Sequence, residues 1–242
     1  MSGHNKWSKV KRLKEVTDKK KSALYSKYIK EISIAAKHGG ADPANNARLK
    51  KAISDAKAQS VPKDNIERAL KKASGELDDG QTLEEITYEG YGPGGVAVLV
   101  ECITDKRART QPELRKIFER SGGNIAEAGA VAWGFERKGV ILVPKDAIEE
   151  NALMEKTLEA GAEDLNSSSE GYEITTPPNE FMQVVDALEN AKIATEFSEL
   201  SFIPKNKVKV EGELVDKINQ LVENLEENDD VQRVTTNADF PD

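Results

Sequence analysis

The spacing of the apolar residues changes near residue 77, and this change constrains the fold more than any other feature. Up to Ser74 the apolar residues recur at intervals of three and four, which is typical of amphipathic helices. Beyond Gln81 they gather into short continuous runs mixed with further helical spacing. The polar segment 77–81, which contains two Asp and a Gly, separates the two patterns. The sequence therefore predicts a helical N-terminal domain followed by an α+β body.

Three short helices are predicted in the N-terminal part. The first ends at Gly39 and Gly40, which can supply a left-handed C-terminus. Asp42 before Pro43 has the pattern of an N-cap and a first helical residue, so we expect the second helix to begin there. Pro62 precedes the third, which Gly75 ends. The apolar faces, rich in Ala, predict a small bundle with a thin core: Leu24, Tyr28, Ile32, Ala35 and Ala36; then Leu49, Ala52, Ile53 and Ala56; then Ile66, Ala69, Leu70 and Ala73.

The body contains two sets of alternating elements. The first is a strand over 96–103, a helix over 110–120 with a capping-box spacing at Thr110 and Glu113, and a strand over 131–135. The second consists of strands and helices in the order β-α-β-β-α-β: 140–143, 148–160, 164–167, 172–175, 181–191 and 195–203. The helix near Leu214–Leu225 and the strand near 231–235 would complete the first set.

This order predicts that one module is inserted into the other. We expect an α+β protein in which a small helical bundle precedes two ferredoxin-like α/β modules. The predicted boundaries are residues 1–78 for the basic helical domain, 79–138 plus 205–242 for a discontinuous α+β domain, and 139–204 for the inserted module.

Charge is sorted along the chain. The net charge is -8, yet residues 1–74 contain 19 Lys and Arg against 7 Asp and Glu, and the remaining 168 residues contain 16 against 36. Such asymmetry indicates an anionic partner for the N-terminal part, and neutralisation of nucleic-acid phosphates is the commonest use of a basic patch. The candidate nucleic-acid contacts are Lys6, Trp7, Lys9, Lys11, Arg12, Lys14, Lys19, Lys20, Lys21, Lys27, Lys30, Arg48, Lys50, Lys51, Lys57, Lys63, Arg68, Lys71 and Lys72. Trp7 and Tyr25 could stack on bases or belong to the core.

A smaller basic cluster, Lys106, Arg107 and Arg109, is predicted in the turn before the helix at Thr110. It could be a second phosphate contact or a solvated turn. The sequence contains neither a zinc finger nor a leucine-zipper heptad, so it does not identify an element that would read bases.

The residues usually needed for catalysis are scarce. The chain has two His and one Cys, Cys102, which lies in an apolar run where a small core residue is expected rather than a nucleophile. The glycine-rich stretch 88–95 leads into a strand rather than a helix, which favours a turn over a phosphate-binding loop. Trp133 and Phe135 alternate as core residues of a strand would. We therefore expect no enzyme activity.

No cofactor or metal is expected either, because the acidic segments lack the spacing of a calcium loop and are better explained as solvated faces. No apolar run approaches the ~18 residues of a membrane span. A single cysteine cannot form an internal disulfide, which indicates a reducing, cytoplasmic location.

Five motifs in order resemble the YebC/PmpR family: Gly3–Trp7, Pro62–Ala69, Tyr88–Ala97, Ser121–Asn124 and Val131–Gly139. The resemblance covers the chain from Gly3 to the C-terminal acidic helix. It implies three domains, the second of them discontinuous, and a regulator of gene expression, because members are named as transcriptional regulators and mitochondrial relatives as translational activators of cytochrome c oxidase. The motif at residue 3 follows no targeting segment, so a bacterial cytoplasmic form is expected.

Three functions remain open at this point. The first choice is a DNA-binding transcriptional regulator. The alternative is a ribosome-associated translation factor that relieves stalling at proline runs, since a basic helical patch binds DNA and ribosomal RNA phosphates by the same electrostatics. From a different class, the acidic body could be a protein-interaction module with the basic segment as a solvating arm.

Overall fold

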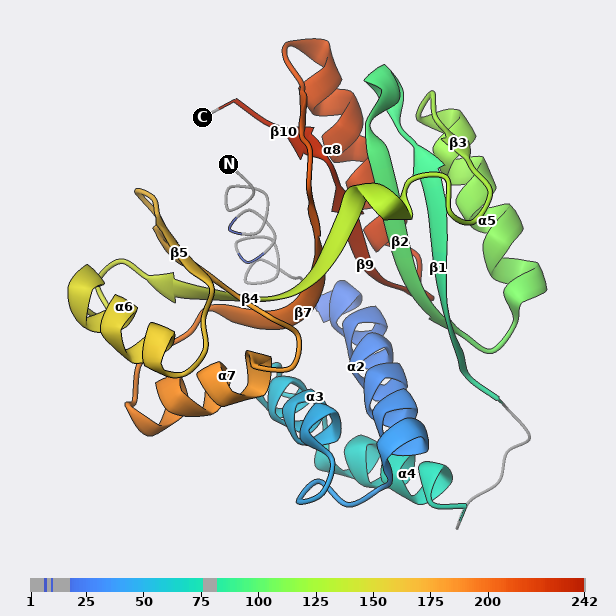
Figure 1. Ribbon diagram of the computed structural model, residues 1–242. Helices are drawn as coiled ribbons and strands as arrows, with labels where there is room; N and C mark the ends of the chain where they lie inside the picture. The colour runs from blue at the N-terminus through green and yellow to red at the C-terminus, as the bar shows by residue number, and fades with distance from the viewer. Residues whose placement is uncertain (1–6, 8–9, 11–17, 76–81, 242) are drawn as a thin grey trace. The chain divides into compact units, whose positions relative to one another are not determined.

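The computed structural model confirms the predicted α+β class: helices come first, followed by two antiparallel sheets (Figure 1). The structure describes residues 7, 10, 18–75 and 82–241. The chain forms two compact units. Unit 1 comprises residues 1–15, 133–211 and 237–242, and unit 2 comprises residues 16–132 and 212–236. The three-domain division expected from the sequence stays a prediction.

The elements of unit 2 are three helices, then a sheet with two further helices. Their bounds are α2 (Asp18–Gly39), α3 (Ala47–Ala58), α4 (Lys63–Ala73), β1 (Glu84–Tyr91), β2 (Ala97–Thr104), α5 (Arg107–Arg120), β3 (Asn124–Ile125), α8 (Glu213–Glu226) and β9 (Val231–Thr236). A 3-10 turn, η1 (Pro93–Gly95), joins β1 to β2.

Helices α2, α3 and α4 bury the Ala-rich faces that the sequence predicts, with Ile32, Leu49 and Ile66 at the centre. The chain leaves α2 through Gly40, whose φ of 88° favours glycine. The start of α3 differs from the prediction: Asn46, not Asp42, is its N-cap, and its side chain accepts a hydrogen bond from the Leu49 N–H. Asp42 instead closes a turn, accepting from the Ala44 N–H.

Asn46 takes the capping position because its amide also satisfies α2. The Asn46 Nδ2 donates to the Ala35 carbonyl at 2.7 Å and to the Gly40 carbonyl at 2.9 Å, and the residue is buried. These carbonyls belong to the end of α2, where the backbone lacks helical partners. A Cβ on Gly39 would lie 2.5 Å from the same amide nitrogen, so glycine is needed there. One side chain thus joins the end of one helix to the start of the next.

The sheet of unit 2 has the strand order β3-β1-β2-β9. Strand β1, which sequence analysis did not identify, pairs with β2 along its whole length, from Glu84 with Thr104 to Tyr91 with Ala97. The glycine-rich stretch ends this hairpin, and Gly94 and Gly95 adopt φ values of 72° and 75°. Its interpretation as a turn is confirmed. Strand β9 pairs antiparallel with β2, and α5 and α8 pack on the sheet and on each other.

Two boundaries in unit 2 correct the sequence analysis. Helix α5 begins at Arg107 rather than Thr110, so Arg107 and Arg109 lie in its first turn and Lys106 is its N-cap. The strand expected over 131–135 begins only at Phe135, the first residue of β4 (Phe135–Pro144). Residues 132–134 form a 3-10 turn, η2 (Ala132–Gly134), because the Val131 and Ala132 N–H groups donate to the carboxylate of Glu89 instead of to a neighbouring strand.

Unit 1 contains the predicted β-α-β-β-α-β order, and its sheet order is β5-β6-β4-β7. The bounds are β4 (Phe135–Pro144), α6 (Glu150–Glu159), β5 (Asp164–Ser167), β6 (Gly171–Thr176), α7 (Phe181–Asn190) and β7 (Phe197–Pro204). Two short parallel strands follow, β8 (Val208–Lys209) and β10 (Ala238–Asp239).

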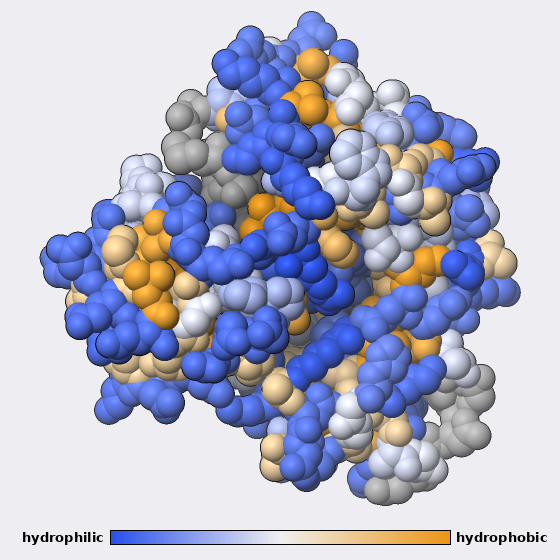
Figure 2. Space-filling model, in the orientation of Figure 1, coloured by the Kyte–Doolittle hydropathy of each residue, from blue (hydrophilic) through white to orange (hydrophobic). Residues whose placement is uncertain are grey.

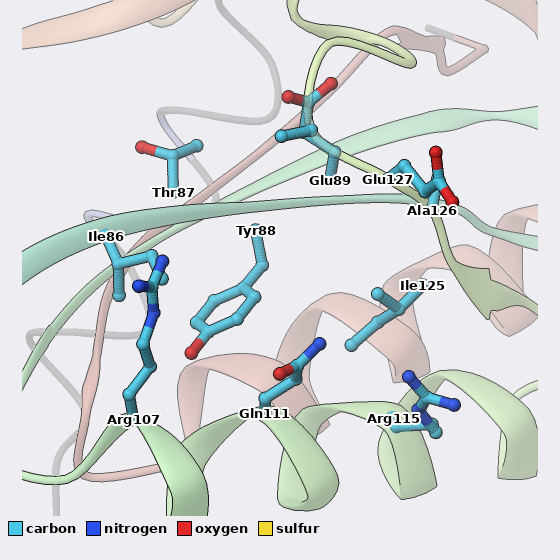
Figure 3. Close-up of a pocket in the computed structure, with 11 residues that line it drawn as sticks. Ile86, Thr87, Tyr88, Glu89, Arg107, Gln111, Arg115, Ile125, Ala126 and Glu127 are labelled. Carbon is cyan, nitrogen blue, oxygen red and sulfur yellow. The ribbon is translucent and has the colours of Figure 1, made fainter.

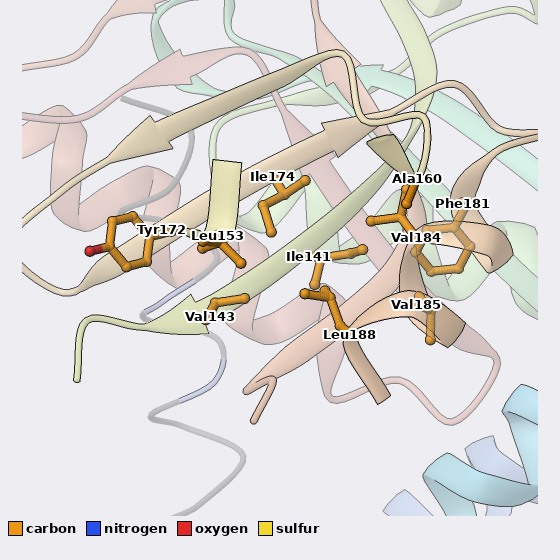
Figure 4. Close-up of a cluster of buried hydrophobic side chains, with 10 residues drawn as sticks. All are labelled: Ile141, Val143, Leu153, Ala160, Tyr172, Ile174, Phe181, Val184, Val185 and Leu188. Carbon is orange, nitrogen blue, oxygen red and sulfur yellow. The ribbon is translucent and has the colours of Figure 1, made fainter. Parts of the chain in front are cut away.

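Both faces of this sheet are covered. Ile141, Val143 and Ile174 point toward Val184 and Leu188 of α7 in a closed apolar cluster (Figure 4). Leu142, which alternates with its neighbours along β4, points to the opposite face, where it packs with Trp7 and Val10. Burying each of these large side chains contributes about 1.5–3 kcal/mol.

Candidate nucleic-acid interface

The candidate contacts fall into three groups. Lys6, Lys9, Lys11, Arg12 and Lys14 lie outside the described residues, as do the side chains of Lys19 and Lys20. A second group is used in ion pairs or hydrogen bonds inside unit 2. A third group lies exposed on α3 and α4.

Two lysines of α2 contact the segment between α8 and β9. Lys27 donates to the Glu226 carbonyl at 2.5 Å. Lys30 donates to Asp230 Oδ1 at 2.6 Å and to the Asp229 carbonyl at 2.9 Å, and 19% of its side chain is exposed. These contacts hold α2 against the end of α8 and its connection to β9, so we exclude Lys27 and Lys30 from the proposed interface.

Arg48 joins three elements. Its Nε lies 2.8 Å from Glu31 of α2, and its two Nη atoms lie 2.5 Å and 3.2 Å from the carboxylate of Glu85 on β1. Burial opposes the guanidinium charge, but the hydrogen bonds to Glu85 and Glu31 outweigh it and raise the pKa of Arg48. Lys51 is also paired, with Asp55 at 2.7 Å. Both residues therefore have a structural role.

The exposed group forms the remaining surface, which we call the α3–α4 basic set: Lys50, Lys57, Lys63, Arg68, Lys71 and Lys72. These residues lie away from the buried positions Leu49, Ala52 and Ala56 of α3 and Ile66 and Ala69 of α4. Lys63 is 85% exposed and lies 3.3 Å from Glu67, an i,i+4 pair that contributes little. Lys21 on α2 is exposed as well. Hydrophilic side chains cover most of the face of the molecule in Figure 2.

The three basic residues of the cluster at 106–109 have different surroundings. Lys106 is exposed at the N-cap of α5. Arg109 lies 2.9 Å from Asp105 and 2.8 Å from Asp230, and Arg107 lies in a groove beside β1. Cations are unfavourable in the first turn of a helix because of the helix dipole, and the two aspartates compensate for Arg109. The three residues are therefore not equivalent.

Asp230 is a residue that sequence reasoning missed. It is 2% exposed, and Lys30 of α2 and Arg109 of α5 both bind its carboxylate, as does the Thr110 hydroxyl at 2.7 Å. Burial would raise its pKa, but the hydrogen bonds from Arg109, Lys30 and Thr110 outweigh this and lower the pKa to about 2. No local signal reveals this site, because its three elements are far apart in sequence.

Of the aromatic residues considered from the sequence, only Trp133 lies in an environment other than the expected one. Trp7 is 6% exposed and packs on Leu142 and Phe197, so its ring faces are covered and it is removed from the candidate contacts. Tyr25 is half-buried against the helical core. Trp133, expected in the core, is 71% exposed because it lies in the turn η2 rather than in a strand. Phe135, the first residue of β4, is buried as expected.

A buried carboxylate shapes the loop that leads to Trp133. Glu89 on β1 accepts hydrogen bonds from the backbone N–H groups of Gly129, Val131 and Ala132, at 2.5, 2.7 and 2.8 Å. Burial opposes its ionisation, but these three hydrogen bonds lower the pKa of Glu89. The charge is therefore used to fix the loop.

Cys102 is in the core of β2, 2% exposed. Burial raises the pKa of its thiol to about 12, so it stays neutral near pH 7. This environment is that of a structural residue and not of an activated nucleophile. In the described part of the chain, no cluster of three or more His, Cys, Asp and Glu side chains could hold a metal ion. None of the described helices is long and apolar enough to cross a membrane.

The fold and the α3–α4 basic set define an α+β protein with an exposed cationic helical surface. The family model described as the TACO1/YebC N-terminal domain matches residues 5–76, and the one described as the second and third domain matches residues 83–238. The chain therefore belongs to the TACO1/YebC family, as its motifs indicate.

Relatives and a solved structure match nearly the whole chain. A probable transcriptional regulatory protein of Geobacter sulfurreducens is 50% identical over 240 residues, which cover 99% of this chain and 96% of the relative. A protein of the same name from Natranaerobius thermophilus is 50% identical, with 100% and 98% covered. The crystal structure of a conserved hypothetical protein from Aquifex aeolicus has a TM-score of 0.85 at 43% identity, covering 93% of each chain.

Proposed function

We propose that this protein is a DNA-binding regulator of transcription, without catalytic activity, that contacts nucleic-acid phosphates through the α3–α4 basic set. The observation that carries the proposal is that these six cations are exposed, whereas residues 75–242 of the chain are strongly acidic. The names of the relatives support a regulatory role. We expect it to act in the cytoplasm.

The physical basis is neutralisation of phosphates with release of counterions. The acidic body repels a polyanion and would turn the basic helices toward it. If about five phosphates are contacted, log K for duplex DNA should fall with log salt with a slope of about -4.5. Lys19, Lys20 and Lys21, in the first turns of α2, stay predicted contributors.

The test compares two variants with the same change of net charge. We expect the triple variant Lys57→Glu, Arg68→Glu and Lys71→Glu to bind all duplex sequences more weakly and with a shallower salt slope. The matched control reverses three exposed lysines of the acidic body: Lys156→Glu, Lys209→Glu and Lys217→Glu. Fluorescence anisotropy of a labelled duplex measures both.

Equal losses in the two variants would show that total charge alone matters, and unchanged binding in both would refute the proposal. The same variants in ribosome co-sedimentation examine the alternative. Loss of ribosome binding together with intact duplex binding would favour a translation factor.

A further inference from the structure

A groove in unit 2 lies between the sheet and helix α5. It has a volume of about 620 Å³ and is open to solvent. Arg107, Gln111 and Arg115 lie along its α5 side, and Tyr88 reaches into it from β1 (Figure 3). Ile86 and Ile125 form the apolar part of its wall. The volume is within the ~300–1,000 Å³ of small-molecule sites.

The three polar residues of α5 share one face because they are spaced by four. Among the described residues, no carboxylate pairs with Arg107 or Arg115. Arg109, two residues from both Arg107 and Gln111, is turned away from the groove to Asp105 and Asp230. The groove therefore holds two cations that have no carboxylate partner among the described residues. Arg107 also lies at the N-terminus of α5, which is the positive end of the helix dipole.

The Tyr88 hydroxyl gives an independent indication of a ligand. Tyr88 is 7% exposed, and its hydroxyl has no hydrogen-bond partner among the described residues. The Arg107 guanidinium lies close to this hydroxyl, but the two groups do not have the geometry of a hydrogen bond. Buried polar groups are normally hydrogen-bonded, so a donor aimed into a groove between cations calls for an anionic or polar acceptor.

Two glutamates are among the lining residues, but the side chain of Glu89 points to the opposite side of β1 from Tyr88 (Figure 3). Glu89 is already bound by three backbone N–H groups of the following loop. Glu127 is exposed at the rim. A carboxylate repels a phosphate but accepts hydrogen bonds from sugar hydroxyls. The ligand should therefore combine an anionic group with hydroxyl donors and an apolar or planar part.

We infer that this groove binds a mononucleotide unit. Its phosphate lies with Arg107 and the Tyr88 hydroxyl at the N-terminal end of α5, and Glu127 accepts from a ribose hydroxyl. The base lies against Ile125, where Gln111 and Arg115 can hydrogen-bond its edge. The unit comes either from a free nucleotide or from an unpaired nucleotide of a strand, since both carry the same groups.

The inference goes beyond the proposed function, because the groove uses none of the α3–α4 basic set. Binding can be measured in the full chain that carries Lys57→Glu, Arg68→Glu and Lys71→Glu, whether or not these substitutions abolish duplex binding. Failure of one proposal is thus distinguishable from failure of the other.

The experiment is calorimetric titration of the full chain with the four ribonucleoside monophosphates, with adenosine, and with a five-residue single-stranded RNA. We expect saturable binding of a monophosphate or of the RNA, and weaker binding of adenosine. The double variant Arg107→Gln with Arg115→Gln should lose at least about tenfold in affinity, as is typical when charged partners are removed. Tyr88→Phe, which keeps the ring, should lose about threefold to tenfold.

The matched control is Lys116→Gln with Arg120→Gln, which removes the same charge from exposed positions of α5. Binding of monophosphates assigns the site to free nucleotides, and binding of the RNA alone assigns it to a strand. No saturable binding of any probe, equal losses in both double variants, or equal binding of adenosine and its monophosphate would overturn the inference. Thermal unfolding of each variant verifies that it is folded.

Discussion

At the residue scale, the same residue type serves different purposes according to what the fold places beside it. Lys30 and Lys57 cannot be told apart by composition, yet one is paired with the buried Asp230 and the other is exposed. Arg107 and Arg109, two residues apart, differ in the same way: Arg107 lines a groove, whereas Arg109 is paired with the buried Asp230. Substituting all these cations together would therefore mix binding with stability.

Asp230→Asn should destabilise unit 2 by about 2–3 kcal/mol at pH 7, the value of a carboxylate whose pKa falls by about two units on folding. The pKa in the folded state is about 2, below the unfolded value, so the stabilisation is present above pH ~4 and is lost as the pH falls toward 2. Urea unfolding at pH 7, 5 and 3.5 measures the difference, which should shrink in acid.

Asp229→Asn is the control, because Asp229 is exposed and only its carbonyl contacts Lys30. It should change stability by less than about 0.5 kcal/mol. A loss in Asp230→Asn that stays the same down to pH 3.5 would contradict the assigned pKa.

At the scale of elements, the connections decide more than the helices and strands do. Helices α2 and α3 meet at Asn46, and β1 meets β2 at a glycine turn. Glycine at 39 is required there by the approach of the Asn46 amide. Small polar residues and glycines therefore fix the geometry on which the α3–α4 basic set depends.

Asn46→Ala should cost about 2–3 kcal/mol, because it removes the cap of α3 and leaves two buried or half-buried carbonyls of α2 without their donor. Asn45→Ala is the control, since Asn45 is exposed and its side chain contacts only Asp42 within the described contacts. Thermal unfolding followed by circular dichroism compares the two. A similar loss in both variants would show that Asn46 does not join the helices.

At the scale of the whole molecule, the chain passes between the two units more than once. The segment that holds Trp7 belongs to unit 1, and α2, which follows it, belongs to unit 2. Unit 1 is then completed by residues 133–211 and 237–242. Trp7 and Val10 are therefore part of the core of unit 1.

Trp7→Ala should lower the stability of unit 1 by about 3 kcal/mol or more, because the indole fills the space between Leu142 and Phe197. Acrylamide quenching tests the burial directly. Trp133→Phe leaves only the buried Trp7 and should be weakly quenched, whereas Trp7→Phe leaves the exposed Trp133 and should be strongly quenched. Strong quenching of Trp133→Phe would show that Trp7 is on the surface.

Features that depend only on neighbours along the chain could be predicted from the sequence alone. Periodicity located the helices and the β-α-β-β-α-β order, and counting charges located the basic segment, since both are properties of short stretches. Which cations stay exposed depends on how distant segments pack in the folded chain. Lys30, Arg109 and Asp230 lie in three distant parts of the sequence, and only their packing reveals that two candidate contacts are structural. For the same reason the α5 groove, built from β1 and a helix sixteen residues later, could be found only in the folded chain.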